Sequence, residues 1–233
     1  MSRLEQSALI AWPANAAVNR VVPKTKIYEH AAVNSRLKDL FVKQVDQITW
    51  LCKLASETIN LPAKDGVSEI QIFSIRLKMP TLHIDVLHCI DRAISHPIFF
   101  ELHYERRVQI IARFKRPTGG SAEAKLPHSD YFAGPWLPQD ARRNSLPTTL
   151  DLAGLYEQLF LQLVPLPPRP NESLPALIRR VAEARDTAHE LTKAVAALEN
   201  EKQFNRKVEL NANVRSLRMK LAQLDAGERG IKP

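Results

Sequence analysis

The chain has 233 residues, of which 45% are hydrophobic, and its formal net charge is +8 at pH 7. This length suits one globular core with an appendage, because domains usually span about 100 to 200 residues. No apolar run reaches the roughly 18 to 20 residues that a membrane span needs, and the first residues lack the pattern of a signal peptide. We therefore expect a cytoplasmic protein without a membrane anchor. Its basic charge suits an acidic partner, such as nucleic acid, an anionic surface or an acidic protein face.

The cysteines give no sign of a metal site. Cys52 and Cys89 each lie within an apolar run, without a CxxC spacing and without histidines at zinc-ligand intervals. Both are expected to be buried thiols of the core. The sequence also lacks a phosphate-binding glycine pattern and a GxSxG elbow, so we expect neither a metal nor a cofactor.

The first half of the chain predicts two helices and a strand. Pro23 stands where a first helical turn accepts proline, which indicates a short helix over 24–32. From Ser35 as an N-cap, apolar residues at mostly helical spacing predict one helix over 35–54. After a break, residues 69–78 carry apolar side chains on both parities, which is typical of a strand covered on both faces.

The second half alternates helical and extended patterns. Helical spacing returns over 81–94, and two β-rich runs at 98–104 and 108–114 are separated by a charged loop, so they are expected to pair as antiparallel strands. Residues 115–147 lose periodicity and collect prolines and glycines, which favours a long loop with a short edge strand. A helix capped by Thr149 or Asp151 then closes the core.

These elements indicate a domain organisation. Residues 1–164 form a mixed α/β or α+β sheet with flanking helices. Residues 165–174 are a proline-rich linker, because proline is excluded from helix interiors and central strands. Residues 175–226 are an amphipathic, coiled-coil-like helical segment, followed by a tail over 227–233.

The helical segment carries two apolar seams with coiled-coil spacing, and the phase between them breaks across 199–209. The segment is therefore either a helical hairpin or one long helix that changes face. Since the break lacks turn residues, we favour one long helix. An apolar seam must pair with its own second half, another copy or a partner subunit. The candidate partner-binding residues are Leu177, Val181, Leu191, Val195, Leu198, Leu210, Val214, Leu217 and Leu221.

One strand resembles part of a metal-dependent nuclease site. Such enzymes place acids on a strand with a lysine two positions beyond the last acid, so that the carboxylates hold the metal. Here Glu101 is followed by His103 instead of lysine, with Asp85 and Asp91 upstream on a predicted helix. The alternative is an ordinary strand whose Glu101 and His103 point to solvent.

Clusters of basic residues are the remaining signal. They can neutralise phosphates, and neighbouring aromatic side chains can stack on bases. The alternative is a solvated surface, because charged turns and helix faces are normally exposed to water. The candidate nucleic-acid-binding residues are Arg106, Arg107, Arg113, Lys115, Arg116, Arg142, Arg143, Lys202, Arg206 and Lys207.

Five segments in the same order resemble a bacterial family called domain of unknown function 4391. They read ALIAWPANAAVNRVVPKTKIYEHA, ITWLCKLASETINLPA, FELHYERRVQIIARFKRP, LDLAGLYEQL and EKQFNRKVELN. The family has no assigned catalytic residues to carry over. The resemblance implies a companion of helicase-type ATPases and DNA methyltransferases in restriction-like or phage-defence loci.

The leading hypothesis is a non-catalytic accessory or assembly subunit of a bacterial DNA restriction-modification or antiviral defence complex. It would dock through its C-terminal helix onto a helicase-type ATPase or DNA methyltransferase, with weak non-specific DNA binding. Two alternatives stay open: a degenerate metal-dependent nuclease, and a stand-alone DNA-binding dimer formed through the C-terminal helix.

Overall fold

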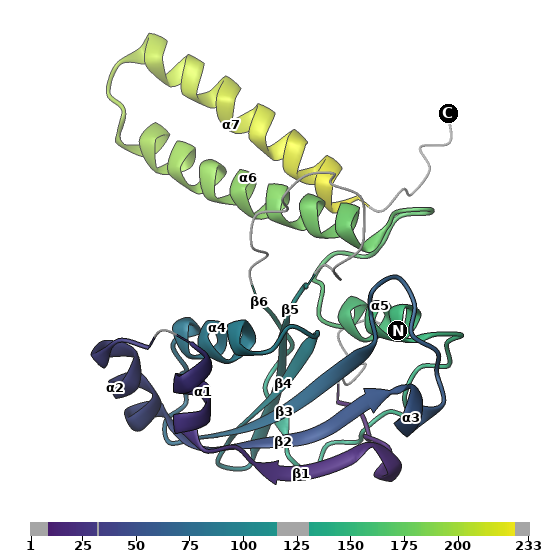
Figure 1. Cartoon of the computed structure of the whole chain (residues 1–233). Helices are drawn as coiled ribbons and strands as arrows, with labels where there is room; N and C mark the ends of the chain where they lie inside the picture. Colours follow the sequence, from purple (N-terminus) through teal and green to yellow (C-terminus); the bar gives the residue numbers. More distant parts are fainter. Residues whose placement is uncertain (1–8, 32, 116–130, 227–233) are drawn as a thin grey trace. The chain divides into compact units, whose positions relative to one another are not determined.

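The computed structural model describes residues 9–31, 33–115 and 131–226. The chain divides into two compact units, Met1–Leu163 and Val164–Pro233. Figure 1 labels the helices and strands of both units.

The first unit is built on a mixed seven-stranded sheet. Among the strands of the described residues, β3 and β4 pair parallel and the other neighbours pair antiparallel. The strands follow the order β1 (Ala17–Val21), β2 (Val45–Ala55), β3 (Glu69–Leu77), β4 (Ile98–Tyr104), β5 (Arg107–Arg113) and β6 (Tyr131–Ala133), and β7 (Leu137–Pro138) also pairs with β5. The expected mixed α/β sheet with flanking helices is confirmed.

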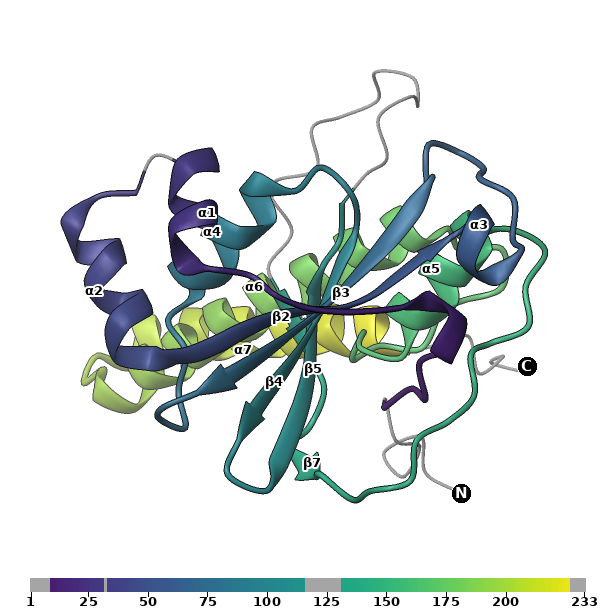
Figure 2. The ribbon, with the colours of Figure 1, turned by 60° about the horizontal axis from the view of Figure 1, so that its bottom comes forward.

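Helices lie against this sheet, with α1, α2 and α4 grouped together and α5 apart from them (Figures 1 and 2). The parallel pair β3 and β4 is joined by α4, as a parallel connection requires a crossover. The helical elements of the unit are η2 (Ala14–Ala16), α1 (Lys24–His30), α2 (Ser35–Gln44), α3 (Ser56–Ile59), α4 (Ile84–Ala93) and α5 (Leu152–Leu161).

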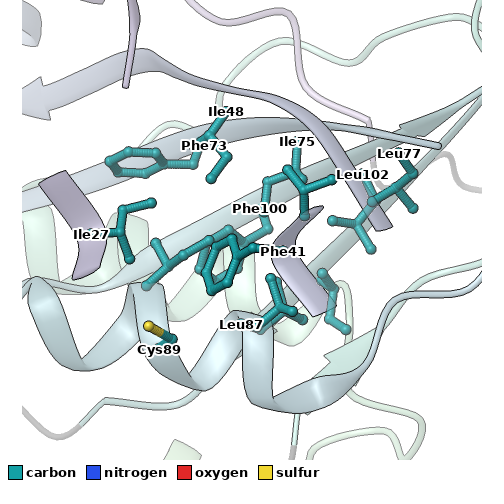
Figure 3. Packing of buried hydrophobic residues seen from close by; sticks show 14 of the residues in the cluster. Ile27, Phe41, Ile48, Phe73, Ile75, Leu77, Leu87, Cys89, Phe100 and Leu102 are labelled. Atoms are coloured by element: carbon teal, nitrogen blue, oxygen red, sulfur yellow. The ribbon is translucent and has the colours of Figure 1, made fainter. Parts of the chain in front are cut away.

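Side-chain alternation along β4 divides the core into two parts. Phe100 and Leu102 face the cluster formed with α1, α2 and α4, where Phe41 and Leu87 are buried (Figure 3). Phe99 has the opposite parity and packs edge-to-face on aromatic rings of α5. Glu101 and His103 share the parity of Phe99, so they lie on the α5 side of the sheet.

The predicted helix over 35–54 is wrong in its second half. The helix α2 begins at Ser35, where the side chain of Asn34 accepts a hydrogen bond from the Leu37 amide. It ends at Gln44, and β2 follows directly. Because the pairing of β2 with β3 shifts register between Trp50 and Cys52, the buried residues of β2 do not alternate strictly with the others, and a run of this kind resembles a helical pattern.

The other expected elements of the first unit are present. The short helix before residue 32 is α1, the strand covered on both faces is β3, and the crossover helix is α4. The antiparallel pair is β4 and β5, joined by a tight turn in which Glu105 adopts φ 52°. Asp151 caps α5 by accepting a hydrogen bond from the Gly154 amide at 2.8 Å. The edge strand β1 was not predicted, because exposed residues give it little apolar pattern.

The second unit is a helical hairpin of α6 (Leu174–Asn200) and α7 (Phe204–Asp225), so the favoured single long helix is wrong. The chain reverses through Glu201 and Gln203, which adopt extended backbone angles, without needing glycine or proline. Buried seam residues such as Val181 and Val214 place the two apolar seams inside the hairpin. The break in phase therefore marks the point where the helix folds back.

The buried side chain of Arg180 joins the segment before α6 to the end of α7, at the base of the hairpin. The Arg180 guanidinium makes two 2.8 Å hydrogen bonds to the Glu172 carboxylate, one from Nε and one from Nη2. It also donates to the carbonyls of Leu224 at 2.6 Å and Pro167 at 2.7 Å. Arg169 donates to further carbonyls at the end of α7. Arg180 therefore satisfies a helix C-terminus and fixes the proline-rich segment to the hairpin.

This geometry predicts different effects of replacing two adjacent arginines. Arg180→Ala leaves Glu172 buried without its cation, and removal of one member of a buried pair costs about 3 to 5 kcal/mol. Arg179 is exposed, so Arg179→Ala should change stability by no more than about 0.5 kcal/mol. Hydrogen exchange followed by mass spectrometry should show faster exchange in α6 and α7 only for Arg180→Ala. Equal protection in both variants would contradict a fastening role for Arg180.

Candidate functional site

A buried carboxylate with a complete set of donors lies on the α5 side of the sheet. Glu101 is 1% exposed. Its oxygens accept hydrogen bonds from Trp12 Nε1 at 2.6 Å, Arg143 Nη1 at 2.8 Å and Arg143 Nη2 at 3.2 Å. His103 Nε2 lies 3.3 Å from Glu101 Oε2. The interpretation of Glu101 as a solvent-facing strand residue is therefore wrong.

Two chain segments without long regular elements converge on this carboxylate. Trp12 precedes η2, and Arg143 lies between β7 and α5. The segments bind each other directly, since the Ala11 amide donates to the Asn144 carbonyl at 2.8 Å and Arg143 Nη1 donates to the Ile10 carbonyl at 2.9 Å. One glutamate of β4 thus holds both segments on the sheet.

The electrostatics of this site keep Glu101 ionised. Burial alone would raise the pKa of Glu101, but hydrogen bonds from His103, Arg143 and Trp12 outweigh it and lower the pKa to about 2. Nearby, burial and the charge of Glu101 raise the pKa of the Cys52 thiol to about 11. Cys52 is therefore a neutral core thiol at pH 7 and not a nucleophile.

Two adjoining cavities border the site and share Ser74 and His103. Glu101 holds one nitrogen of the His103 ring, so this imidazole can present a hydrogen-bonding group to a polar ligand. One cavity has a volume of about 520 Å³, with a wall that includes Trp12, Asn19, Cys52 and Arg143. The other, of about 670 Å³, is lined by residues including Asp46, Thr49, Arg76 and Gln139.

The three carboxylates of the nuclease hypothesis have different partners. Asp85 lies 3.4 Å from His83, Asp91 is bound by cations, and Glu101 is bound by Trp12, His103 and Arg143. Glu101 also lies on the α5 side of the sheet, whereas Asp85 and Asp91 belong to α4. Within residues 9–31, 33–115 and 131–226, no group of three or more His, Cys, Asp or Glu side chains could hold a metal ion.

Asp91 organises a second buried ionic cluster at the end of α4. Its carboxylate lies 2.7 Å from Arg113 Nη2 and 2.9 Å from Lys115 Nζ. Lys115 Nζ also donates to the carbonyls of Asp91, Ile94 and His96, which satisfies the C-terminus of α4. Burial lowers the pKa of Lys115, while Asp91 opposes this effect. Arg113 and Lys115, two candidate nucleic-acid-binding residues, therefore point into the protein.

The remaining basic candidates lie at several places. Arg106 and Arg107 are exposed at the turn between β4 and β5, and Arg142 is exposed on the segment that follows β7. Arg143 is engaged with Glu101. At the hairpin tip, Lys202, Arg206 and Lys207 are exposed. Arg116 lies outside the described residues.

The predicted seam residues line the inside of the hairpin. Leu177, Val181 and Val214 are buried, and the other six are partly buried, namely Leu191, Val195, Leu198, Leu210, Leu217 and Leu221. A second apolar face was missed. On α7, Phe204 is 79% exposed, Val208 54% and Met219 57%. Their spacing of four and eleven residues equals one and three helical turns, so a helical projection of 204–225 would have revealed it.

The family assignment rests on a match that covers most of the chain. The model of the family described as domain of unknown function (DUF4391) matches residues 10–221. The chain belongs to this family. No curated protein and no solved structure matches this chain. In the described part of this DUF4391 chain, every helix is too short or too polar to cross a membrane.

The depressed pKa of Glu101 predicts an acid-dependent loss of stability. The pKa falls from 4.5 to about 2 on folding, which corresponds to about 3 kcal/mol of stabilisation above pH 4.5. This stabilisation is lost as the pH falls from about 4.5 through about 2. Glu101→Gln does not titrate, so the gap in free energy of unfolding between the two proteins should narrow over this range.

The measurement is chemical denaturation at several pH values between 6 and 2. Asp140→Asn removes an exposed carboxylate of the same unit and should follow the natural chain at every pH. A gap between the natural chain and Glu101→Gln that stayed constant from pH 6 to pH 2 would show that Glu101 does not change its pKa on folding.

Proposed function

We propose that this chain is a non-catalytic accessory or assembly subunit of a bacterial DNA restriction-modification or phage-defence complex. It docks through its C-terminal hairpin onto a helicase-type ATPase or a DNA methyltransferase. The choice of complex rests on the family resemblance, which implies a companion of such enzymes. The docking role rests on the surface of the hairpin.

The observation that carries the proposal is the exposed apolar face of α7. The inner seam of the hairpin is already covered, because α6 and α7 pack on each other. Phe204, Val208 and Met219 nevertheless stay exposed. A helix that is apolar on opposite faces is typically buried on both, and clustered apolar side chains on a surface mark protein interaction sites. The outer face of α7, rather than the inner seam, is thus the docking surface.

A contribution from DNA fits the same role. Arg106, Arg107 and Arg142 are exposed on the sheet unit and carry no carboxylate partner among the residues that the structure describes. Contacts of this kind neutralise phosphates without reading sequence, so the affinity is weak and falls steeply with salt. Such contacts would keep the subunit close to the DNA on which its partner acts.

The proposal predicts that hairpin integrity is required for assembly. The tagged full chain, purified from its own host after nuclease treatment, should bring down a helicase-type ATPase or a DNA methyltransferase. Leu191→Asp with Val195→Asp places two charges in the inner seam and should abolish this co-purification, because it opens the hairpin. Lys193→Asp with Ala197→Asp adds the same number of aspartates at exposed positions of α6 and should retain the partner.

Mass spectrometry identifies the partner, and the sheet unit should still unfold cooperatively in both double variants. Partner capture by the Leu191→Asp, Val195→Asp chain at the natural level would refute docking through the hairpin. DNA cleavage by the purified chain with magnesium or manganese, lost in Glu101→Ala, would refute a non-catalytic role.

A further inference from the structure

The exposed apolar residues of α7 form part of a continuous stripe. Phe204, Val208, Ala212, Arg215 and Met219 follow each other at steps of four, four, three and four residues, and all are exposed. At 100° per residue these positions share one face of the helix, opposite the inner seam. We call these five residues the outer stripe.

We infer that the outer stripe binds an acidic amphipathic helix of a partner protein. The inference rests on the proposed function and adds the chemistry of the partner. An apolar stripe of about four helical turns matches the length of a helical recognition segment, whose anchors recur at intervals of three and four residues. The charges around the stripe indicate the sign of the charge that the partner helix carries.

Unpaired cations border the stripe on one side. Lys207 and Arg218 lie along one edge, three helical turns apart, and Arg215 interrupts the stripe itself. Across the described chain, no carboxylate lies within ion-pair distance of any of these three side chains, and only the charge of Lys207 acts on a carboxyl group, by helping to lower the pKa of Glu201. Lys220, which projects from another face, is by contrast 2.9 Å from Glu183 of α6. Within the hairpin, Lys220 thus has an ion-pair partner on α6, whereas the cations next to the stripe can pair with carboxylates of another protein.

A second copy of this chain fits the stripe poorly. The α7 sequence has five Lys or Arg residues and two Asp or Glu residues, so pairing two copies would bring cations together along the contact. Nucleic acid fits less well than protein, because phosphates do not cover Phe204, Val208 and Met219. A helix with an apolar face and flanking Asp or Glu residues satisfies both features.

The test begins with a photoreactive amino acid in place of Val208 in the full chain, expressed in its own host. Illumination should crosslink it to a partner peptide that carries apolar residues at helical spacing with Asp or Glu beside them. The matched control carries the same photoreactive group at Asn213, which is exposed but lies well away from the stripe on the helix surface. This control should not crosslink to that peptide.

Charge exchange then decides between an acidic helix and a merely apolar contact. Arg215→Glu should reduce the crosslink about tenfold or more, as expected for a central interface cation. Replacing the partner's nearest acidic residue by arginine should restore it. Arg206→Glu, an exposed reversal on another face of α7, should leave the crosslink unchanged.

Crosslinks to other molecules overturn the inference. A crosslink to another copy would make the stripe a homodimer contact, one to residues 9–163 would make it an internal contact, and one to nucleic acid would make it a DNA surface. The absence of any crosslink, while a photoreactive group at Leu210 still reaches α6, would show a solvated face. If a methyltransferase or ATPase co-purifies equally well with Arg215→Glu, the inference fails and the proposed function stands. If the captured acidic helix belongs to a protein without a role in DNA modification, the inference stands and the proposed function fails.

Discussion

An ion pair between the buried Glu101 of β4 and Arg143 positions two irregular segments of the sheet unit. A carboxylate that is 1% exposed is tolerable only with a cation and hydrogen-bond donors around it, and Arg143, Trp12 and His103 provide them. Because Trp12 and Arg143 belong to segments with little regular structure, the pair does more than neutralise a charge. It fixes where both segments cross the sheet, and it therefore shapes the cavities that adjoin His103.

The hairpin unit uses the same device at its own base. Arg180 is buried against Glu172 and donates to carbonyls of the proline-rich segment and of α7. Proline carries no amide hydrogen, so this segment cannot be held by a backbone ladder, and a side chain with several donors replaces one. In both units an arginine paired with a glutamate thus orders segments that lack regular secondary structure, while the apolar core supplies most of the stability.

The sequence could reveal the elements whose pattern is local, and it failed where the deciding contact is distant. The short apolar run on both parities of β3 and the helical spacing in α4 are local patterns that follow from burial, so both were predictable. In β2 a shift of register against β3, between Trp50 and Cys52, interrupts the alternation that would have separated strand from helix. The burial of Glu101 depends on Trp12 and Arg143, which lie 89 and 42 residues away in sequence, and no local pattern encodes such a meeting.

The hairpin shows what the most regular apolar pattern of the sequence corresponds to in the structure. A seam with coiled-coil spacing is regular because it must fit a neighbouring helix, and here that neighbour is in the same chain. The packing of α6 on α7 buries Leu177, Val181 and Val214 and partly covers the rest of the seam. The outer stripe lies on the face of α7 opposite the inner seam, and its residues Phe204, Val208 and Met219 are exposed to water. Apolar surface that the fold leaves uncovered is the more informative signal, because folding alone does not explain its presence.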